Sequence, residues 1–455
     1  MSTRVLVIGG GPAGHEAASH AARFGAEVTL VERDVLGGSA HLLDCVPSKS
    51  MIATGGAMSF SRRVEGMGLA HVDPEIDSAM LRERIEAIEK RIETSITRLL
   101  TSQGVRILRG TGVLTGPHTA TAHLEDGSTV DLEADYIILC TGSAPRIPEW
   151  APLDGERVLT TRDAYPPEEF PSHLIVVGSG VTGVEFVHMF ASLGAKVSLI
   201  VSRQQVLPQK DPEAAAVLEA DFLNRGVELY KGARATGIER DGDEVIVSCS
   251  DGRVARGSHA LLAIGSVPNS AGIGLDAAGV EVNEWGYPEV DHNLATNVRH
   301  IYVAGDLSGK LPLSSVATMQ GRKIAEHLMG MHHGRDHRHI DYDKAASAIF
   351  TEPEIADVGL AEAEAFADGR KIRVTKVPFS ANAKALINDS PVGFVKIISD
   401  PNTGVVLGGS IIGRHAAELI SVIALAVNSR LRVQDIQESL FVYPTLSESL
   451  IDAAE

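Results

Sequence analysis

The feature that most constrains the fold of this chain is an internal repeat. The segment "VLVIGGGPAGHEAA", which starts at Val5, returns as "LIVVGSGVTGVEFV" from Leu174. Each copy combines an apolar strand, a glycine-rich turn and a helix, and a second apolar strand follows, "EVTLVE" in one case and "KVSLIV" in the other. Because two strands joined through a helix lie parallel, the repeat predicts two α/β domains of the dinucleotide-binding type.

The similarity between the two halves continues beyond these units. "GVRILRG" and "GVELYKG" each lead into a predicted meander with a tight turn, at Asp126-Gly127 and at Asp251-Gly252. Apolar residues at three- and four-residue steps predict an amphipathic helix over residues 80–100. After about residue 341 the pattern changes to antiparallel strands and a long apolar helix from Ala416, which indicates a separate α+β domain.

Composition restricts the partners and the location that we expect. The 455 residues carry 59 acidic and 41 basic side chains, spread along the chain, which argues against binding nucleic acid or an anionic membrane. No segment reads as transmembrane, and the apolar start lacks a signal-peptide cleavage site. Three cysteines (Cys45, Cys140 and Cys249) cannot form a disulfide framework, so we expect a reducing, cytoplasmic location.

The first glycine turn has the spacing of a pyrophosphate-binding site. Gly9 permits the tight turn, Gly11 lets a pyrophosphate approach the backbone, and Gly14 lets the helix pack on the strand. Glu32 ends the following strand, where a carboxylate can bind ribose hydroxyls.

The second turn repeats this spacing but lacks the acid. Gly178, Gly180 and Gly183 occupy the three glycine positions, and the next strand runs into Ser202 and Arg203. These two side chains could accommodate a 2′-phosphate, which favours NADPH over NADH. A solvated loop charge is the alternative interpretation of Arg203.

Several motifs together resemble the pyridine nucleotide-disulfide oxidoreductases, the family of dihydrolipoamide dehydrogenase and glutathione reductase. "GGSAHLLDCVPSK" resembles that family's G-G-T-C-x4-C-x-P-S-K, and "CTGSAPRIP", "IYVAGD", "FTEPEIADVG" and "YPTLSES" resemble further family segments along essentially the whole chain. The resemblance implies that the first turn binds FAD, with Thr141, Gly142 and Asp306, and that the second binds NAD(P)H, with Gly265. It also implies a homodimer.

The same resemblance implies a domain division and a fold class. We expect an FAD-binding domain over residues 1–148 and 272–340, an NAD(P)-binding domain over 149–271 and a dimer-interface domain over 341–455. The fold class is α/β, with two Rossmann-like dinucleotide-binding domains and a C-terminal α+β dimerisation domain.

Two departures from the family pattern exclude disulfide substrates. Cys45 matches the second cysteine of the redox loop, but Ala40 stands at the first, and Tyr443 stands where the family has a histidine, although Glu448 remains. Thiol-disulfide exchange needs a second sulfur, and a phenol is a poor acid-base group near neutral pH. In these respects the chain resembles the actinobacterial NAD(P)H:quinone reductases, which similarly lack the disulfide.

The part of the family machinery that delivers hydride is retained. Lys49 and Glu185 match the pair that the family places beside the flavin and the nicotinamide, where the lysine puts positive charge near flavin N5. Electrons would then pass directly to a flat, electron-poor acceptor, for which a quinone fits best. Tyr443 and Glu448 would line the acceptor cleft from the partner subunit.

The role of Cys45 stays open, and with it the alternative functions. Pro47 predicts a helix N-terminus beside Cys45, which favours a thiolate in contact with the flavin, but a small buried residue explains the sequence equally well. The alternatives are a single-cysteine flavin peroxidase or NAD(P)H oxidase, a transhydrogenase or diaphorase, and a non-catalytic flavin redox sensor. His41 and Asp44 could contact an acceptor or simply be solvated.

Overall fold

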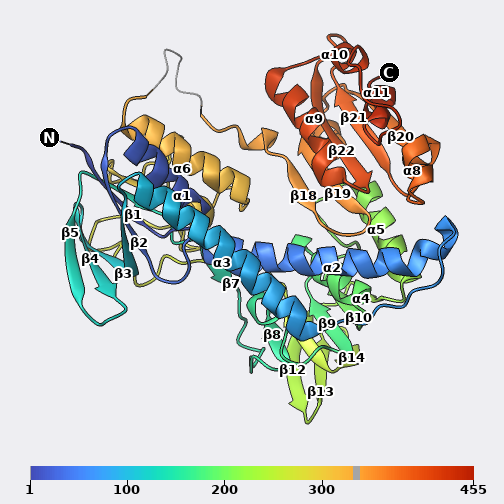
Figure 1. Cartoon of the computed structure of the whole chain (residues 1–455), viewed down its shortest axis with the longest axis horizontal. Helices are drawn as coiled ribbons and strands as arrows, with labels where there is room; N and C mark the ends of the chain where they lie inside the picture. The colour runs from blue at the N-terminus through green and yellow to red at the C-terminus, as the bar shows by residue number, and fades with distance from the viewer. Residues whose placement is uncertain (1, 332–338) are drawn as a thin grey trace. The chain divides into compact units, whose positions relative to one another are not determined.

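The computed structural model describes residues 2–331 and 339–455, and the chain divides into two compact units. The first unit comprises Met1–Pro47, Ala79–Arg146 and Gly265–Tyr342. The second unit comprises Ser48–Ser78, Ile147–Ile264 and Asp343–Glu455. The mixed α/β composition of the chain is visible in Figure 1.

A seven-stranded sheet organises the first unit, in the order β17-β6-β1-β2-β3-β4-β5. The first five strands of this order are parallel, and β3, β4 and β5 form an antiparallel meander. The bounds are β1 Arg4–Ile8, β2 Glu27–Glu32, β3 Arg106–Gly116, β4 Thr119–Leu124, β5 Thr129–Glu133, β6 Tyr136–Leu139 and β17 Ile301–Val303. The predicted parallel pair and the turn at Asp126-Gly127 are both confirmed.

Helices α1 (Pro12–Arg23) and α6 (Ser314–Leu328) pack side by side in this unit, as Figure 1 shows. Their close approach depends on Gly321, because a Cβ atom there would lie 2.1 Å from the carbonyl oxygen of Ala13. The predicted amphipathic helix is α3 (Ser78–Ser102). A short antiparallel pair, β7 (Ser143–Pro145) and β16 (Ser266–Pro268), joins two distant segments of the chain.

The second unit contains a parallel sheet in the order β11-β10-β9-β15-β8. Helix α4 (Val181–Ser192) connects β9 to β10, which confirms the second strand–turn–helix–strand unit. The strands are β8 Val158–Thr160, β9 His173–Val177, β10 Lys196–Val201, β11 Glu228–Lys231 and β15 His259–Leu262. Helix α5 (Pro212–Asn224) follows β10, and the meander comprises β12 (Ala235–Asp241), β13 (Glu244–Cys249) and β14 (Val254–Gly257).

The C-terminal part of the second unit is an antiparallel sheet in the order β18-β19-β22-β21-β20, as predicted from the change of pattern. Its strands are β18 Ser347–Ile349, β19 Glu354–Gly359, β20 Arg373–Pro378, β21 Phe394–Ser399 and β22 Val406–Gly413. Helix α9 (Ala416–Ser429) packs on β19 and β22. The shorter helices are α7 Glu362–Ala367, α8 Ala383–Ile387, α10 Val433–Gln437 and α11 Glu448–Ala454.

Among the described residues, no helix combines the length and the apolar character that spanning a membrane would require.

Candidate functional site

The first glycine turn, between β1 and α1, leaves no space for a side chain at Gly9 or at Gly14. Gly9 has a φ of +101°, and a Cβ atom on it would lie 2.2 Å from the carbonyl oxygen of Cys140. A Cβ atom on Gly14 would lie 1.8 Å from the carbonyl oxygen of Gly9. Gly11 is the N-cap of α1, so the free backbone N–H groups at the start of this helix are available to an anion.

Glu32 is fixed beside this turn, at the end of β2. Its carboxylate is buried and accepts hydrogen bonds from the N–H groups of Gly10, at 2.5 Å, and Asp34, at 2.7 Å. Because each carboxylate oxygen has two acceptor sites, a ribose hydroxyl can still bind after these backbone contacts are made.

The predicted FAD residues Thr141 and Gly142 contact Asn269, and Ser143, which follows them, contacts the predicted FAD residue Asp306. Thr141 Oγ1 donates to the carbonyl oxygen of Asn269 at 2.8 Å, and the Asn269 amide donates to the Thr141 carbonyl at 2.9 Å. The backbone N–H of Asn269 also donates to the carbonyl of Gly142. Ser143 Oγ donates to Asp306 at 2.7 Å. The sequence predicted Thr141, Gly142 and Asp306 here but missed the bracing by Asn269.

His15 and His41 support the fit of this unit to FAD. The Nδ1 atom of each ring is buried and has no hydrogen-bond partner in the described part of the chain. Burial lowers the pKa of both imidazoles, so they are neutral near pH 7. His15 lies in α1 next to the glycine turn and was not singled out from the sequence. Together with the open turn and Glu32, these unsatisfied nitrogens fit a bound dinucleotide.

The redox-loop segment has a conformation that the sequence did not predict. Ser39–Cys45 forms a π-helix that continues directly into α2 (Val46–Arg63), so Cys45 adjoins a helix as expected but does not face a free helix N-terminus. Ala40 is exposed and Cys45 is half-buried. All three cysteines are free thiols, and Cys140 is a core residue whose pKa burial raises to about 12.

The second glycine turn repeats the tight geometry in the second unit. Gly178 has a φ of +112°, and a Cβ atom on Gly183 would lie 1.9 Å from the carbonyl oxygen of Gly178. Gly180 is the N-cap of α4, and a Cβ atom there would meet nothing within 4 Å. The space beside the Gly180 Cα atom is therefore open to a ligand, whereas the space beside the Gly183 Cα atom is filled by backbone.

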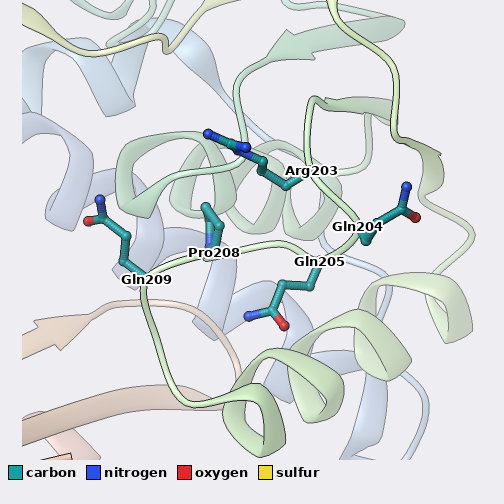
Figure 2. A pocket seen from close by; sticks show the side chains of 5 residues that line it. All are labelled: Arg203, Gln204, Gln205, Pro208 and Gln209. Atoms are coloured by element: carbon teal, nitrogen blue, oxygen red, sulfur yellow. The ribbon is translucent and has the colours of Figure 1, made fainter. Parts of the chain in front are cut away.

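Arg203 lines a cavity of about 420 Å³ just after β10. The other lining residues are Gln204, Gln205, Pro208 and Gln209. Figure 2 shows the Arg203 and Gln204 side chains pointing away from each other. Ser202 is exposed beside Arg203. Gly265 belongs to the first unit, where it has a φ of +99° and its carbonyl accepts from the Arg146 N–H.

Lys49 and Glu185 form the predicted pair within the second unit. Lys49 Nζ donates to Glu185 Oε2 at 2.8 Å, and the carboxylate is buried. The other oxygen, Oε1, accepts the backbone N–H of Phe350 at 2.9 Å, and the Phe350 ring centroid lies 4.9 Å from Lys49 Nζ. Phe350 thus contacts both partners of the pair, Glu185 through its N–H and Lys49 through its ring. No local sequence pattern predicted this role.

Tyr443 and Glu448 lie close in sequence at the end of the second unit. Tyr443 is 73% exposed and follows exposed Leu440 and Val442. Glu448 begins α11 and accepts the N–H of Thr445 at 3.1 Å. The phenol is therefore available to a second molecule, while the glutamate fixes the turn that carries it.

The geometry agrees with what comparison with known proteins finds. A family model described as pyridine nucleotide-disulphide oxidoreductase matches residues 3–321, and that family's dimerisation-domain model matches residues 345–454. This chain belongs to that family. It is therefore an oxidoreductase of the two-Rossmann-domain fold with a C-terminal dimerisation domain, and the family implies FAD and NAD(P)H as cofactors.

Its relatives include both quinone and lipoyl enzymes. A Mycobacterium tuberculosis protein named NAD(P)H dehydrogenase (quinone) is 42% identical over 100% of this chain and 94% of its own length. A Zymomonas mobilis dihydrolipoyl dehydrogenase is 33% identical over 98% and 96% of the two chains. The crystal structure of LpdA from M. tuberculosis matches with a TM-score of 0.94 and 42% identity, covering 99% of each chain.

A matched pair of glycine variants separates folding from nucleotide binding. We expect Gly183→Ala to lower the free energy of unfolding by about 1–3 kcal/mol, because its Cβ collides with the Gly178 carbonyl. Gly180→Ala has space and an ordinary φ of −74°, so it should keep the melting temperature but weaken NADPH binding about tenfold or more by blocking the pyrophosphate. Thermal unfolding and titration calorimetry measure the two effects; equal stability of both variants would contradict the prediction.

Proposed function

We propose that the chain transfers hydride from NADPH to FAD and passes electrons directly to a quinone, without a disulfide relay, as a cytoplasmic homodimer. The observation that carries this proposal is that Lys49 and Glu185 are paired in the expected way while Ala40 replaces the sulfur that a disulfide relay needs. The name of the 42% identical relative supports a quinone acceptor, and the dimerisation domain supports a homodimer.

In this reaction the Lys49–Glu185 pair would hold a positive charge in place against the negative charge that develops. Bound FAD would supply the two-electron store between nucleotide and acceptor. Glu185 holds the Lys49 ammonium through one oxygen while Phe350 fixes the other, so a positive charge stays in place when negative charge develops. The overall change consumes NADPH, a quinone and one proton, and yields NADP⁺ and a hydroquinone.

Arg203 supports the preference for NADPH. Within the described chain its guanidinium makes no hydrogen bond or ion pair, and it lines the cavity beyond β10. Guanidinium groups bind phosphate through two parallel N–H donors. Because no carboxylate ends β10, a 2′-phosphate meets no like charge at that strand end.

Replacing Cys45 with Ser distinguishes this function from a peroxidase. We expect NADPH-dependent reduction of menadione and short benzoquinones to stay within about twofold of wild type, because sulfur takes no part in the relay. Steady-state assays with quinones, hydrogen peroxide, lipoamide and NAD⁺ as acceptors make the measurement.

Each other outcome of these assays identifies a rival. Peroxide reduction lost with Cys45→Ser supports the single-cysteine peroxidase, whose sulfenic acid needs that thiol. Rapid NADPH-to-NAD⁺ exchange supports a transhydrogenase. Slow turnover with every acceptor supports a redox sensor, and brisk lipoamide reduction contradicts the proposal.

The nucleotide preference is tested by Arg203→Ala. Losing a charged hydrogen bond to phosphate should raise the KM for NADPH about 10- to 100-fold and leave the KM for NADH nearly unchanged. Arg234→Ala is the control, since Arg234 is another exposed arginine of the same unit. Equal increases in KM for NADPH and NADH would show that Arg203 does not recognise the 2′-phosphate.

Tyr443 is proposed to donate its hydroxyl to a quinone oxygen from the partner subunit. Tyr443→Phe should lower kcat/KM for quinones by about two- to tenfold, the effect of one neutral hydrogen bond. Flavin reduction by NADPH, followed by stopped-flow absorbance, should stay at the wild-type rate because the hydroxyl acts after that step. Unchanged quinone kinetics would exclude the contact.

A further inference from the structure

The loop over residues 202–211, which carries the cavity-lining side chains, is held in a constrained conformation. Leu207 is buried and has a φ of +49°, in the left-handed region that leucine rarely adopts. Such a conformation persists only where the surrounding structure imposes it. The contacts that impose it therefore hold one end of the stretch that begins at Arg203, whose carbonyl oxygen accepts the N–H of Gly232 at 2.9 Å.

One group of contacts ties the 202–211 loop to the second glycine turn and to α5. The Leu207 N–H donates to the carbonyl oxygen of Ser179, inside the second glycine turn, at 2.8 Å. The Val206 N–H donates to Glu219 on α5 at 2.9 Å. Leu207 is thus bonded directly to the turn that we expect to bind the pyrophosphate.

A second group ties the C-terminal end of the loop to the antiparallel sheet. Lys210 Nζ contacts both carboxylate oxygens of Asp357 on β19, at 2.6 and 2.9 Å, and Ser347 on β18 at 2.8 Å. Ser347 Oγ donates to the same carboxylate at 2.6 Å. The loop therefore has a fixed attachment three residues after Leu207.

Lys396 on β21 makes the most buried attachment, with only 2% of its side chain exposed. Its ammonium lies 2.7 Å from Asp211, 2.6 Å from Glu213 and 3.0 Å from Glu362. Burial alone would lower the pKa of Lys396, but hydrogen bonds to the three carboxylates raise it above its usual value, so the charge is retained. Asp211 also caps α5, which fixes the residue where the loop ends.

We propose that Lys210 and Lys396 are positioning residues for the nicotinamide nucleotide, through which the C-terminal domain sets the conformation of the 202–211 loop. Neither lysine lines the Arg203 cavity. They act through Leu207 and Arg203, and the part of the inference that concerns the 2′-phosphate rests on the proposed use of NADPH. The dimerisation domain accordingly positions the nucleotide-binding loop in addition to its role in assembly.

The experiment compares Lys210→Met and Lys210→Arg in the FAD-loaded full chain. Lys210→Met should speed amide hydrogen exchange over residues 203–210 about tenfold and raise the KM for NADPH about three- to tenfold, with kcat within about twofold, because Lys49 and Glu185 are untouched. Lys210→Arg should restore both values, since it can pair with Asp357. Lys371→Met is the control, because Lys371 is an exposed lysine of the same domain.

Lys396→Met tests the buried attachment more severely. It leaves Asp211 and Glu362 without this buried cation and leaves Glu213 with Lys376 alone, so a lower melting temperature accompanies the loss of nucleotide affinity. Lys210→Met keeps the proposal testable if Lys396→Met does not fold, because Lys210 and Asp357 are partly exposed. Wild-type exchange together with a wild-type KM in Lys210→Met would overturn the proposal.

Binding of 2′,5′-ADP separates this inference from the proposed function. If Arg203→Ala weakens that ligand and Lys210→Met changes neither binding nor exchange, the positioning role fails while NADPH recognition stands. If Arg203→Ala has no effect on it, the NADPH assignment fails. Faster exchange in Lys210→Met would still support the attachment of the loop in that case.

Discussion

The structure depends on the close approach of backbone to backbone at the two glycine turns. At Gly14 and at Gly183 any Cβ atom would collide with a carbonyl oxygen of the same turn. Each helix can therefore begin directly against the strand that precedes it, with its N-terminal N–H groups facing an open space. One local geometry thus provides two candidate cofactor sites, and different side chains surround each of them.

The sequence predicted most of the fold because its signals are local. Apolar strands, glycine spacing and Asp-Gly turns lie within a few residues of one another, and the parallel order of β1 and β2 or of β9 and β10 follows from their helical connections. The π-helix over Ser39–Cys45 was not predictable in this way. Its seven residues have no periodicity that separates a π-helix from a turn or the start of an α-helix.

The candidate site was predictable where a motif carries it, and not where tertiary contacts complete it. Lys49 and Glu185 were found from their motif positions, although 136 residues separate them. The Phe350 N–H that fixes Glu185 could not be found, because a backbone donor has no sequence signature. The same holds for Lys396, whose three carboxylate partners come from other elements and give an internal lysine no distinguishing pattern.

The placement of the three cysteine thiols has a consequence for how the protein reacts with toxic metalloids. Cys140 is buried with its pKa raised to about 12, and Cys249 is buried in β13, so only half-buried Cys45 offers a thiol of ordinary accessibility. Trivalent arsenicals bind tightly when two neighbouring sulfurs chelate them. A chain with one accessible thiol offers them a single sulfur and therefore no chelate.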